Sequence, residues 1–255
     1  MALLQLLKKV VSAIGERLFV NLTNLMARNG LILQAFGLPD GSILSAALGA
    51  LGSSKTMSAI TNASEAVATL EASHGVIEND ILVVTSGWLK LNKRIVRADS
   101  VSSNDVTLED INTASTSRFP AGSGIGSIKE VPSNGWTQLP YIKDFQGSGG
   151  EQQTVTEEFL DSDDQYEFFT SRTPRRYNCG IAYQGPSATH FPLLVTASEN
   201  KTETPFRIVF PDGSVTYFLA VPAFDPVPSL NKGQIQVNSL VMLVRAEPTL
   251  YAAAA

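Results

Sequence analysis

Reactive side chains are scarce in this sequence, which has a single cysteine, Cys179, and two histidines, His74 and His190. One cysteine cannot close a disulfide within the chain, and two histidines exclude a multi-histidine metal site. A lone free cysteine usually behaves as a small buried side chain, and we expect this of Cys179. We expect His190 to be a surface or capping residue at the start of a helix rather than a general base.

Positive charge is also lacking, because 19 lysines and arginines face 24 aspartates and glutamates, a net charge of −5. This balance excludes a generally basic protein that holds nucleic acid by neutralising phosphates, so any contact with DNA is local or transient. Charged residues make up 17% of the chain, below the ~25% of an average soluble domain. We therefore expect other subunits to cover much of the surface. A chain of 255 residues allows one large or two small domains.

The N-terminal segment lacks the ~20 consecutive apolar residues that a membrane span needs. Apolar residues recur at helical spacing over Leu3–Leu25 and predict an amphipathic helix. Lys8 and Lys9 interrupt the apolar run too early for a secretory signal. Three interpretations stay open, namely a helix packed on the domain or on a neighbour, a helix on a membrane surface, or an extension before a start at Met26. The glycine- and alanine-rich segment Leu31–Ser54 predicts an extended arm that lies on a partner.

No motif typical of catalysis or cofactor binding is complete. The glycines of Gly122–Gly126 follow no strand–helix pattern and precede no Lys-Ser/Thr, as a nucleotide loop requires. Asp161, Asp163 and Asp164 do not follow the ligand order of a calcium loop. Glu157 or Glu158 with Asp161 resembles a glycosidase pair only in composition, since nothing fixes their separation. We predict no enzyme activity, no cofactor and no bound metal.

What the sequence does have is a succession of β-like segments. Five short runs with turn residues between them predict a compact antiparallel β unit at about 56–131; they are Ala66–Leu70, Ile81–Thr85, Arg94–Ala98, Val106–Leu108 and Gly126–Val131. A basic run lies within this unit and predicts a solvated strand face or a contact between subunits; it consists of Lys90, Lys93, Arg94 and Arg97.

Residues 151–171 contain seven acidic residues and no basic one, so this segment carries the negative charge of the molecule. β-like flanks on both sides of Leu160–Gln165 predict a long hairpin with an acidic tip. Three arginines follow directly. The candidate contact residues are the acidic and amide residues of the tip, Asp161, Asp163, Asp164, Gln165 and Glu167, and the basic residues Arg172, Arg175 and Arg176.

The remaining pattern predicts one helix and several strands. Ser187–Asn200 has an apolar stripe at helical spacing, with Ser187 or Thr189 as the cap. Phe206–Leu219 predicts two strands joined by a Pro-Asp-Gly turn. The alternation over Gln234–Arg245 changes phase near Asn238, which predicts a β-bulge.

The order of these segments resembles the tail tube, or major tail, protein of long-tailed, non-contractile bacteriophages. The resemblance covers about residues 40–250 and rests on the glycine-led acidic hairpin, the short helix and several further segments. These segments are Lys55–Thr69, Asn79–Trp88, Arg118–Gly126, Phe206–Phe218 and Pro228–Gly233. The Leu3–Leu25 helix departs from the family pattern.

The resemblance implies a mainly β fold, an antiparallel β-sandwich with one internal α-helix, a long hairpin, a small β insertion and an N-terminal helix or arm. Its implied division is an N-terminal helix and arm at 1–39, a β domain at 40–250 with the insertion at about 56–131, and a C-terminal tail at 251–255. We treat these boundaries as predictions.

The resemblance also implies the role of a structural virion protein that forms hexameric rings. Such rings stack into a hollow tube around a tape-measure protein, meet terminator and baseplate or tail-tip proteins, and later conduct double-stranded DNA. No stable membrane binding is expected. The subunit would reside in the host cytoplasm before assembly and in the virion afterwards.

Charge suggests how such contacts and passage work. The acidic tip and the three arginines are candidates for two unlike patches that meet between subunits, and pairing within one hairpin is the alternative. An acidic or neutral lumen would repel phosphates at short range, so DNA would slide rather than bind. Strand alternation places Glu157 and Glu158 on opposite faces, and we select Glu158 as the lumen candidate.

Three other functions stay open at this point. The inner tube of a contractile injection system would have a related subunit. A carbohydrate-binding or adhesive β-sandwich would use exposed aromatic residues, for which the candidates are Trp88, Trp136, Tyr141 and Tyr166. A hydrolase would use the acidic pairs. A tube subunit differs from a binder or hydrolase in that it polymerises as its concentration rises.

Overall fold

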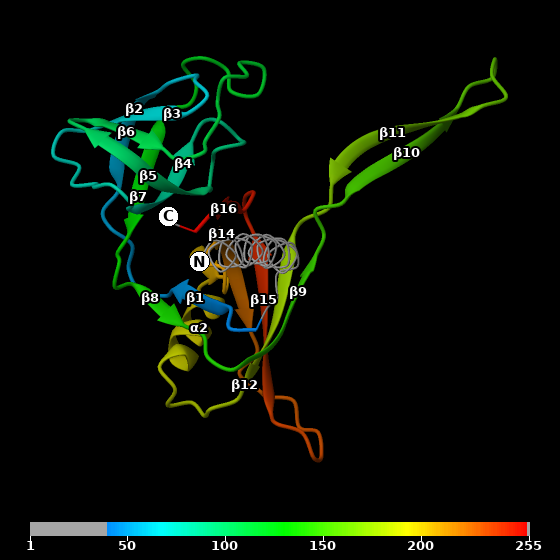
Figure 1. The fold of residues 1–255 in the computed structure, drawn as a ribbon. Coiled ribbons are helices and arrows are strands. Elements are labelled where there is room, and N and C mark those ends of the chain that lie inside the picture. The colour runs from blue at the N-terminus through cyan, green and yellow to red at the C-terminus, as the bar shows by residue number, and fades with distance from the viewer. Residues whose placement is uncertain (1–39, 254–255) are drawn as a thin grey trace, which may run out of the picture.

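A computed structural model describes residues 40–253 of the chain. The predicted Leu3–Leu25 helix and the first part of the predicted arm lie outside these residues. The described chain is mainly β with antiparallel sheets and one helix, α2 (His190–Glu199), as predicted. Its parts are an eight-stranded sheet, a closed barrel and a two-stranded hairpin (Figure 1).

The eight-stranded sheet, called the main sheet below, collects strands from both ends of the described chain. Its order is β8 (Trp136–Gln138), β1 (Ile43–Ala47), β13 (Thr204–Val209), β14 (Val215–Phe224), β15 (Val237–Val244), β12 (Arg176–Ala182) and β9 (Ile142–Ser148), and β16 (Thr249–Tyr251) pairs with β14. The predicted Phe206–Leu219 hairpin is β13 and the first half of β14. Because β8 and β9 each pair on one side only, they form two open edges at opposite ends of the order.

Alternation along β14 gives the main sheet a core on each face. Phe218 and Ala220 point into a cluster with Leu194 of α2, whereas Tyr217 and Leu219 point into a cluster with residues from the outer wall of the barrel. Successive strand residues face opposite sides, so one strand serves both cores. The predicted sandwich therefore takes the form of an open sheet that packs against the wall of a barrel.

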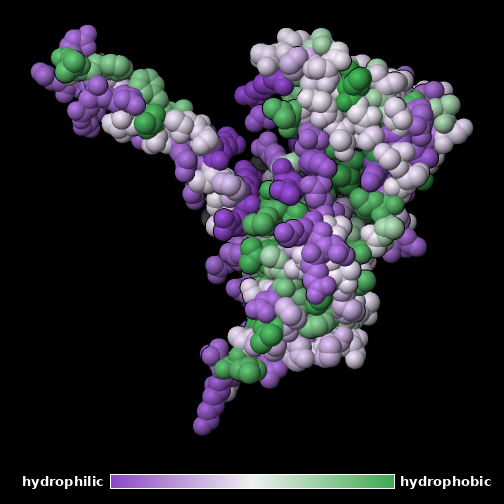
Figure 2. All heavy atoms as spheres, turned by 180° about the vertical axis from the view of Figure 1, so that it is seen from behind, coloured by the Kyte–Doolittle hydropathy of each residue, from purple (hydrophilic) through white to green (hydrophobic). Residues whose placement is uncertain are grey.

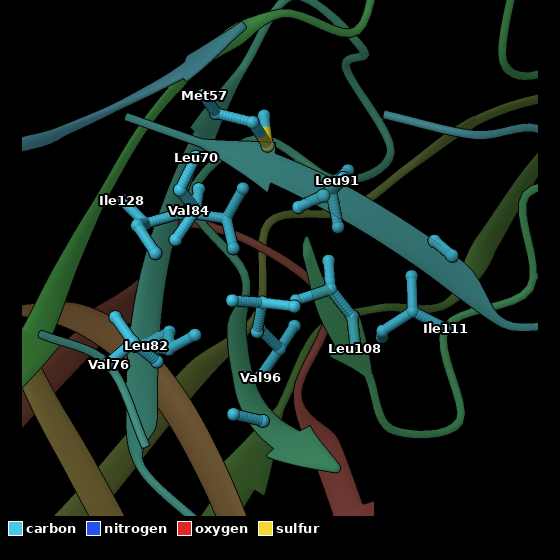
Figure 3. Packing of buried hydrophobic residues seen from close by; sticks show 14 of the residues in the cluster. Met57, Leu70, Val76, Leu82, Val84, Leu91, Val96, Leu108, Ile111 and Ile128 are labelled. Atoms are coloured by element: carbon cyan, nitrogen blue, oxygen red, sulfur yellow. The ribbon is translucent and has the colours of Figure 1, made fainter. Parts of the chain in front are cut away.

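The barrel forms where the compact β unit is predicted. Its strands are β2 (Lys55–Ile60), β3 (Ala66–Leu70), β4 (Ile81–Ser86), β5 (Ile95–Ser102), β6 (Asp105–Leu108) and β7 (Gly126–Val131), closed in the order β2-β3-β6-β5-β4-β7. Side chains from several of these strands converge in its interior (Figure 3). Trp88 is fully buried there, and its indole N–H donates to the Pro120 carbonyl at 2.7 Å. Because the barrel is closed, its strands pair with one another and leave no free strand edge.

The predicted long hairpin consists of β10 (Gln152–Glu158) and β11 (Gln165–Arg172). These strands pair only with each other and leave the body of the molecule between β9 and β12 (Figure 1). Every residue of both strands is exposed. Figure 2 shows the hairpin as a narrow projection on which hydrophilic and hydrophobic residues alternate.

Two predictions about the strands of the main sheet are wrong. Ile43–Ala47, which falls in the predicted extended arm, is β1, and its last four residues are buried between β8 and β13. The predicted bulge near Asn238 is absent, since β15 pairs with β12 in continuous register from Val237 onward. The phase change arises because Ile235 precedes the strand.

The start of the helix and the end of the last strand also differ from the predictions. His190 begins α2 but is buried rather than at the surface, and Thr189 takes the cap position without a side-chain capping hydrogen bond. Tyr251 falls in the predicted C-terminal tail, yet it ends β16 and is buried. Its hydroxyl accepts a hydrogen bond from the backbone N–H of Arg97 in the barrel at 2.8 Å.

Candidate assembly surfaces

The acidic tip of the hairpin presents three free carboxylates to solvent. Asp161, Asp163 and Asp164 are exposed, and the salt bridges of the described residues include none of them. The turn is held locally, because the Ser162 hydroxyl accepts the Asp164 N–H at 3.1 Å. Phe159 and Tyr166 pack against each other behind it, with ring centroids 5.7 Å apart. The tip therefore exposes negative charge on a turn that local contacts hold in place.

The three arginines lie at the other end of the hairpin. Arg172 stands opposite Gln152 in the register and donates from Nε to its side-chain oxygen at 3.2 Å. Arg175 follows the hairpin and its side chain lies over Gly150, and Arg176 is an exposed residue of β12. The structure does not bring the arginines to the acidic tip of the same hairpin. The intrachain alternative is therefore absent from the described residues.

Glu158, the lumen candidate, lies on the hairpin rather than on the main sheet. It stands opposite Gln165, whose side-chain amide donates to the Glu158 carboxylate. Glu167 pairs with Thr156 in the same ribbon. That Glu158 faces a lumen stays a prediction.

The hairpin also exposes apolar side chains that the sequence interpretation did not single out. Val155 and Phe168 are register partners, and Phe169 stands opposite Thr154 with 78% of its surface exposed. Leu160 at the tip is fully exposed. Exposed apolar surface of this kind marks an interaction site or an aggregation risk, and both strands of the ribbon have free edges. The visible signal in the sequence is the run of aromatic residues within an otherwise acidic segment.

A second missed feature is a pocket of about 240 Å³ at the junction of barrel and main sheet. It is lined by Arg97 from the barrel and by Trp136, Arg207 and Tyr217 from the main sheet. The Arg207 guanidinium carbon lies 4.7 Å from the centroid of the Trp136 ring. Burial lowers the pKa of this guanidinium. Arg97 is already bound to Glu109. We call this site the Arg207 pocket.

Three residues of the basic run, Lys93, Arg94 and Arg97, form contacts within the chain, whereas Lys90 is exposed. Lys93 of the barrel pairs with Glu203 at 2.8 Å, and Arg245 reaches the same carboxylate at 3.5 Å. Arg94 donates to the Thr249 hydroxyl of β16 at 3.3 Å. These bonds tie the barrel to the main sheet, and neither predicted role accounts for them.

Residues 40–253 contain no group of three or more histidine, cysteine, aspartate or glutamate side chains that could hold a metal ion. Cys179 is buried as predicted, and desolvation raises the pKa of its thiol to about 12, so it is not a nucleophile at neutral pH. Burial lowers the pKa of His190. No helix of this part of the chain is long and apolar enough to cross a membrane.

The aromatic candidates for sugar binding are scattered. Trp88 is enclosed in the barrel, and Trp136 is covered by Arg207. Tyr141 is exposed beside β9, whereas Tyr166 packs on Phe159 in the hairpin. No two of the four stand together as a stacking platform.

Comparison with known proteins gives one family. Residues 86–253, well over half of the chain, match the sequence model of the phage tail tube protein, TTP. No curated protein matches the chain. Among solved structures, the tail of an empty gene transfer agent particle with C6 symmetry is 11% identical, with 47% of this chain and 89% of that chain covered and a TM-score of 0.38.

A second solved structure, the virion of a native gene transfer agent, is also 11% identical. The match covers 48% of the present chain and 92% of the gene transfer agent chain, with a TM-score of 0.37. TM-scores this low do not decide the fold or the function, so the family match alone carries the assignment. The chain belongs to the phage tail tube protein family and is a structural subunit of a phage tail.

Proposed function

We propose that the chain forms hexameric rings that stack into a hollow tail tube, through which double-stranded DNA passes without any catalytic step. Membership of the tail tube family supports this role. The observation that carries it is the pair of open edges on the main sheet, β8 at one end and β9 at the other. Unlike surfaces on opposite sides of one subunit are what a closed, head-to-tail ring requires.

Joining the main sheets around a ring removes the liability of these edges. A free strand edge is a template for pairing with another chain, and closure into a continuous sheet satisfies its backbone groups. The hairpin adds a second surface, because its exposed acidic and apolar residues belong to none of the buried clusters of the subunit. We propose that the tip and the arginines Arg172, Arg175 and Arg176 both lie in contacts between subunits.

The passage of DNA follows from charge. With a net charge of −5 per subunit, six copies around a lumen would repel phosphates at short range and would not hold them. Glu158 is our candidate for this repulsion. The further partners of such a tube are a tape-measure protein, a terminator and baseplate or tail-tip proteins. Assembly would take place in the host cytoplasm, and the role needs no cofactor.

Electron microscopy of the purified chain over a concentration series tests the proposal. We expect six-membered rings or hollow tubes that increase with concentration, because assembly follows mass action. A variant that starts at Met26 should be examined in parallel, since it shows whether residues 1–25 promote or block assembly. Uniform small particles from both proteins at every concentration would contradict the proposed function. A screen of sugar ligands would then be the next step.

A further inference from the structure

Arg207 is a half-buried cation that stacks on Trp136 but has no ion-pair partner among residues 40–253. It lies in the middle of β13, between β1 and β14. Its Nε atom is buried and has no hydrogen-bond partner there, and none of the salt bridges involves it. Asp80 lines the same pocket, but its Oδ2 accepts the backbone N–H of Ile77 at 2.7 Å. The guanidinium therefore lacks a carboxylate partner among the residues that the structure describes.

Such an arrangement is costly for a free subunit. Buried polar groups in proteins are nearly always hydrogen-bonded, and a desolvated charge needs a counter-charge. Tyr217 stands opposite Arg207 in the register and lines the same pocket. A volume of about 240 Å³ has room for the end of one or two acidic side chains. The site has the donors and the size to bind a carboxylate.

We propose that the hairpin tip of a second copy of this chain binds at the Arg207 pocket, with one or two of the Asp161, Asp163 and Asp164 carboxylates inside it. This inference rests on the proposed function and names the surface that receives the hairpin. Charge-assisted hydrogen bonds from a guanidinium to a carboxylate are strong and directional. Within residues 40–253 of one subunit, neither the tip carboxylates nor Arg207 has an ion-pair partner.

The strand order places the hairpin and the Arg207 pocket in different halves of the main sheet. The hairpin continues from β9, the last strand at one open edge. The pocket lies over β8, β13 and β14, in the half of the sheet order that ends at β8 rather than at β9. In Figure 1 the hairpin extends from the β9 side of the main sheet, and β8 lies at the opposite side beside β1. A head-to-tail arrangement therefore directs the hairpin of one copy toward the pocket of another.

The arginines at the base of the hairpin are weaker candidates than Arg207 as partners for the tip carboxylates. Arg172 is exposed and already donates to Gln152, and Arg176 is exposed on β12. Exposed ion pairs contribute little because water screens them, whereas enclosed pairs depend strongly on both partners. These arginines are then free to contact other surfaces of the assembly.

A mixing experiment with two complementary variants tests this pairing. One variant carries Arg207→Glu, and the other carries Asp161→Lys, Asp163→Lys and Asp164→Lys. We expect neither variant to form tubes alone, since in each of them the hairpin tip and the Arg207 pocket carry charges of the same sign. An equimolar mixture should form tubes, because each tip then meets a pocket of opposite charge. Arg176→Glu is the matched control on an exposed arginine, and its defect, if any, should not be relieved by the lysine-tip variant.

Sedimentation and electron microscopy give the result, with circular dichroism of each unassembled variant as the test of folding. If Arg207→Glu does not fold, Arg207→Met keeps the apolar stem and should raise the concentration needed for tubes by about tenfold or more. Tubes from wild type and from Arg207→Glu alike would overturn the inference but leave the proposed function intact. Rescue of Arg176→Glu by the lysine-tip variant would assign the tip to the base arginines instead. Failure of the wild type to assemble would count against the proposed function itself.

Discussion

The barrel and the hairpin are built from the same kind of strand, but they use it in opposite ways. The barrel closes on itself and buries a core around Trp88, whereas every strand residue of the hairpin is exposed. The barrel therefore stabilises one subunit, and the hairpin has no core to stabilise. We propose that contacts with other subunits, rather than a core of its own, stabilise the hairpin.

The main sheet connects these two regions. Its one face packs on the barrel and its open β9 edge leads into the hairpin. Lys93 and Arg245 share the Glu203 carboxylate where barrel and sheet meet, so the barrel is fixed to the body. No comparable ion pair fixes the hairpin among the described residues.

The largest expected effect separates assembly from folding. We predict that Asp161→Ala, Asp163→Ala and Asp164→Ala together abolish tubes but leave the unassembled subunit folded, because the tip has no contact with either core. Sedimentation measures the first effect and thermal unfolding the second. Normal tubes from the triple variant would show that the tip has no role in contacts between subunits.

A matched pair of aromatic substitutions compares the two regions directly. Trp88→Ala should lower the free energy of unfolding by about 3–5 kcal/mol, because it leaves a cavity beside Phe119 and removes the hydrogen bond to Pro120. Phe169→Ala in the hairpin should change it by less than about 0.5 kcal/mol. Urea unfolding of the unassembled subunits measures both. Equal losses from the two substitutions would mean that the hairpin is part of the folded core.

The smallest expected effect is a pH dependence of stability from His190. Burial lowers the pKa of this side chain in the folded state, so the unfolded chain takes up a proton first as the pH falls. The contribution of neutral His190 is fully present above the unfolded pKa of about 6.5 and is lost as the pH falls toward the lower folded value. Urea unfolding at pH 7.5 and 5.5 measures the loss of stability in the wild type and in His190→Gln. The variant should lose less stability between the two pH values, because the contribution of His190 is missing. An unchanged pH dependence in His190→Gln would contradict it.

Much of the fold could be predicted because its signals are local. Turn residues bound each barrel strand, and the acidic segment with β-like flanks is a hairpin in both sequence and structure. Closure of the barrel depends on pairs such as β2 with β7, which are distant in sequence, so no local pattern reports it. β1 was misassigned because its small residues suggested an arm, yet Ala46 and Ala47 are buried in the sheet.

The Arg207 pocket could not be predicted because three segments build it. Residues of the barrel, of β8 and of the β13–β14 hairpin meet there only after the barrel packs on the main sheet. One signal was present, since Arg207 stands between Phe206 and Ile208 in an apolar strand. Alternation puts it on the face opposite Phe206, where a charge needs a partner. The sequence does not show where that partner comes from.

The burial of Cys179 has a practical consequence for studying the assembled particle. With its thiol pKa raised to about 12 and its side chain enclosed by the main sheet, the native cysteine should not react with maleimides at neutral pH. A cysteine introduced at an exposed barrel position such as Leu89, which lies outside the proposed contact, would then be the single reactive thiol among the described residues of each subunit. Fluorophores or spin labels attached there would report on the subunit in rings and tubes without removal of the native residue.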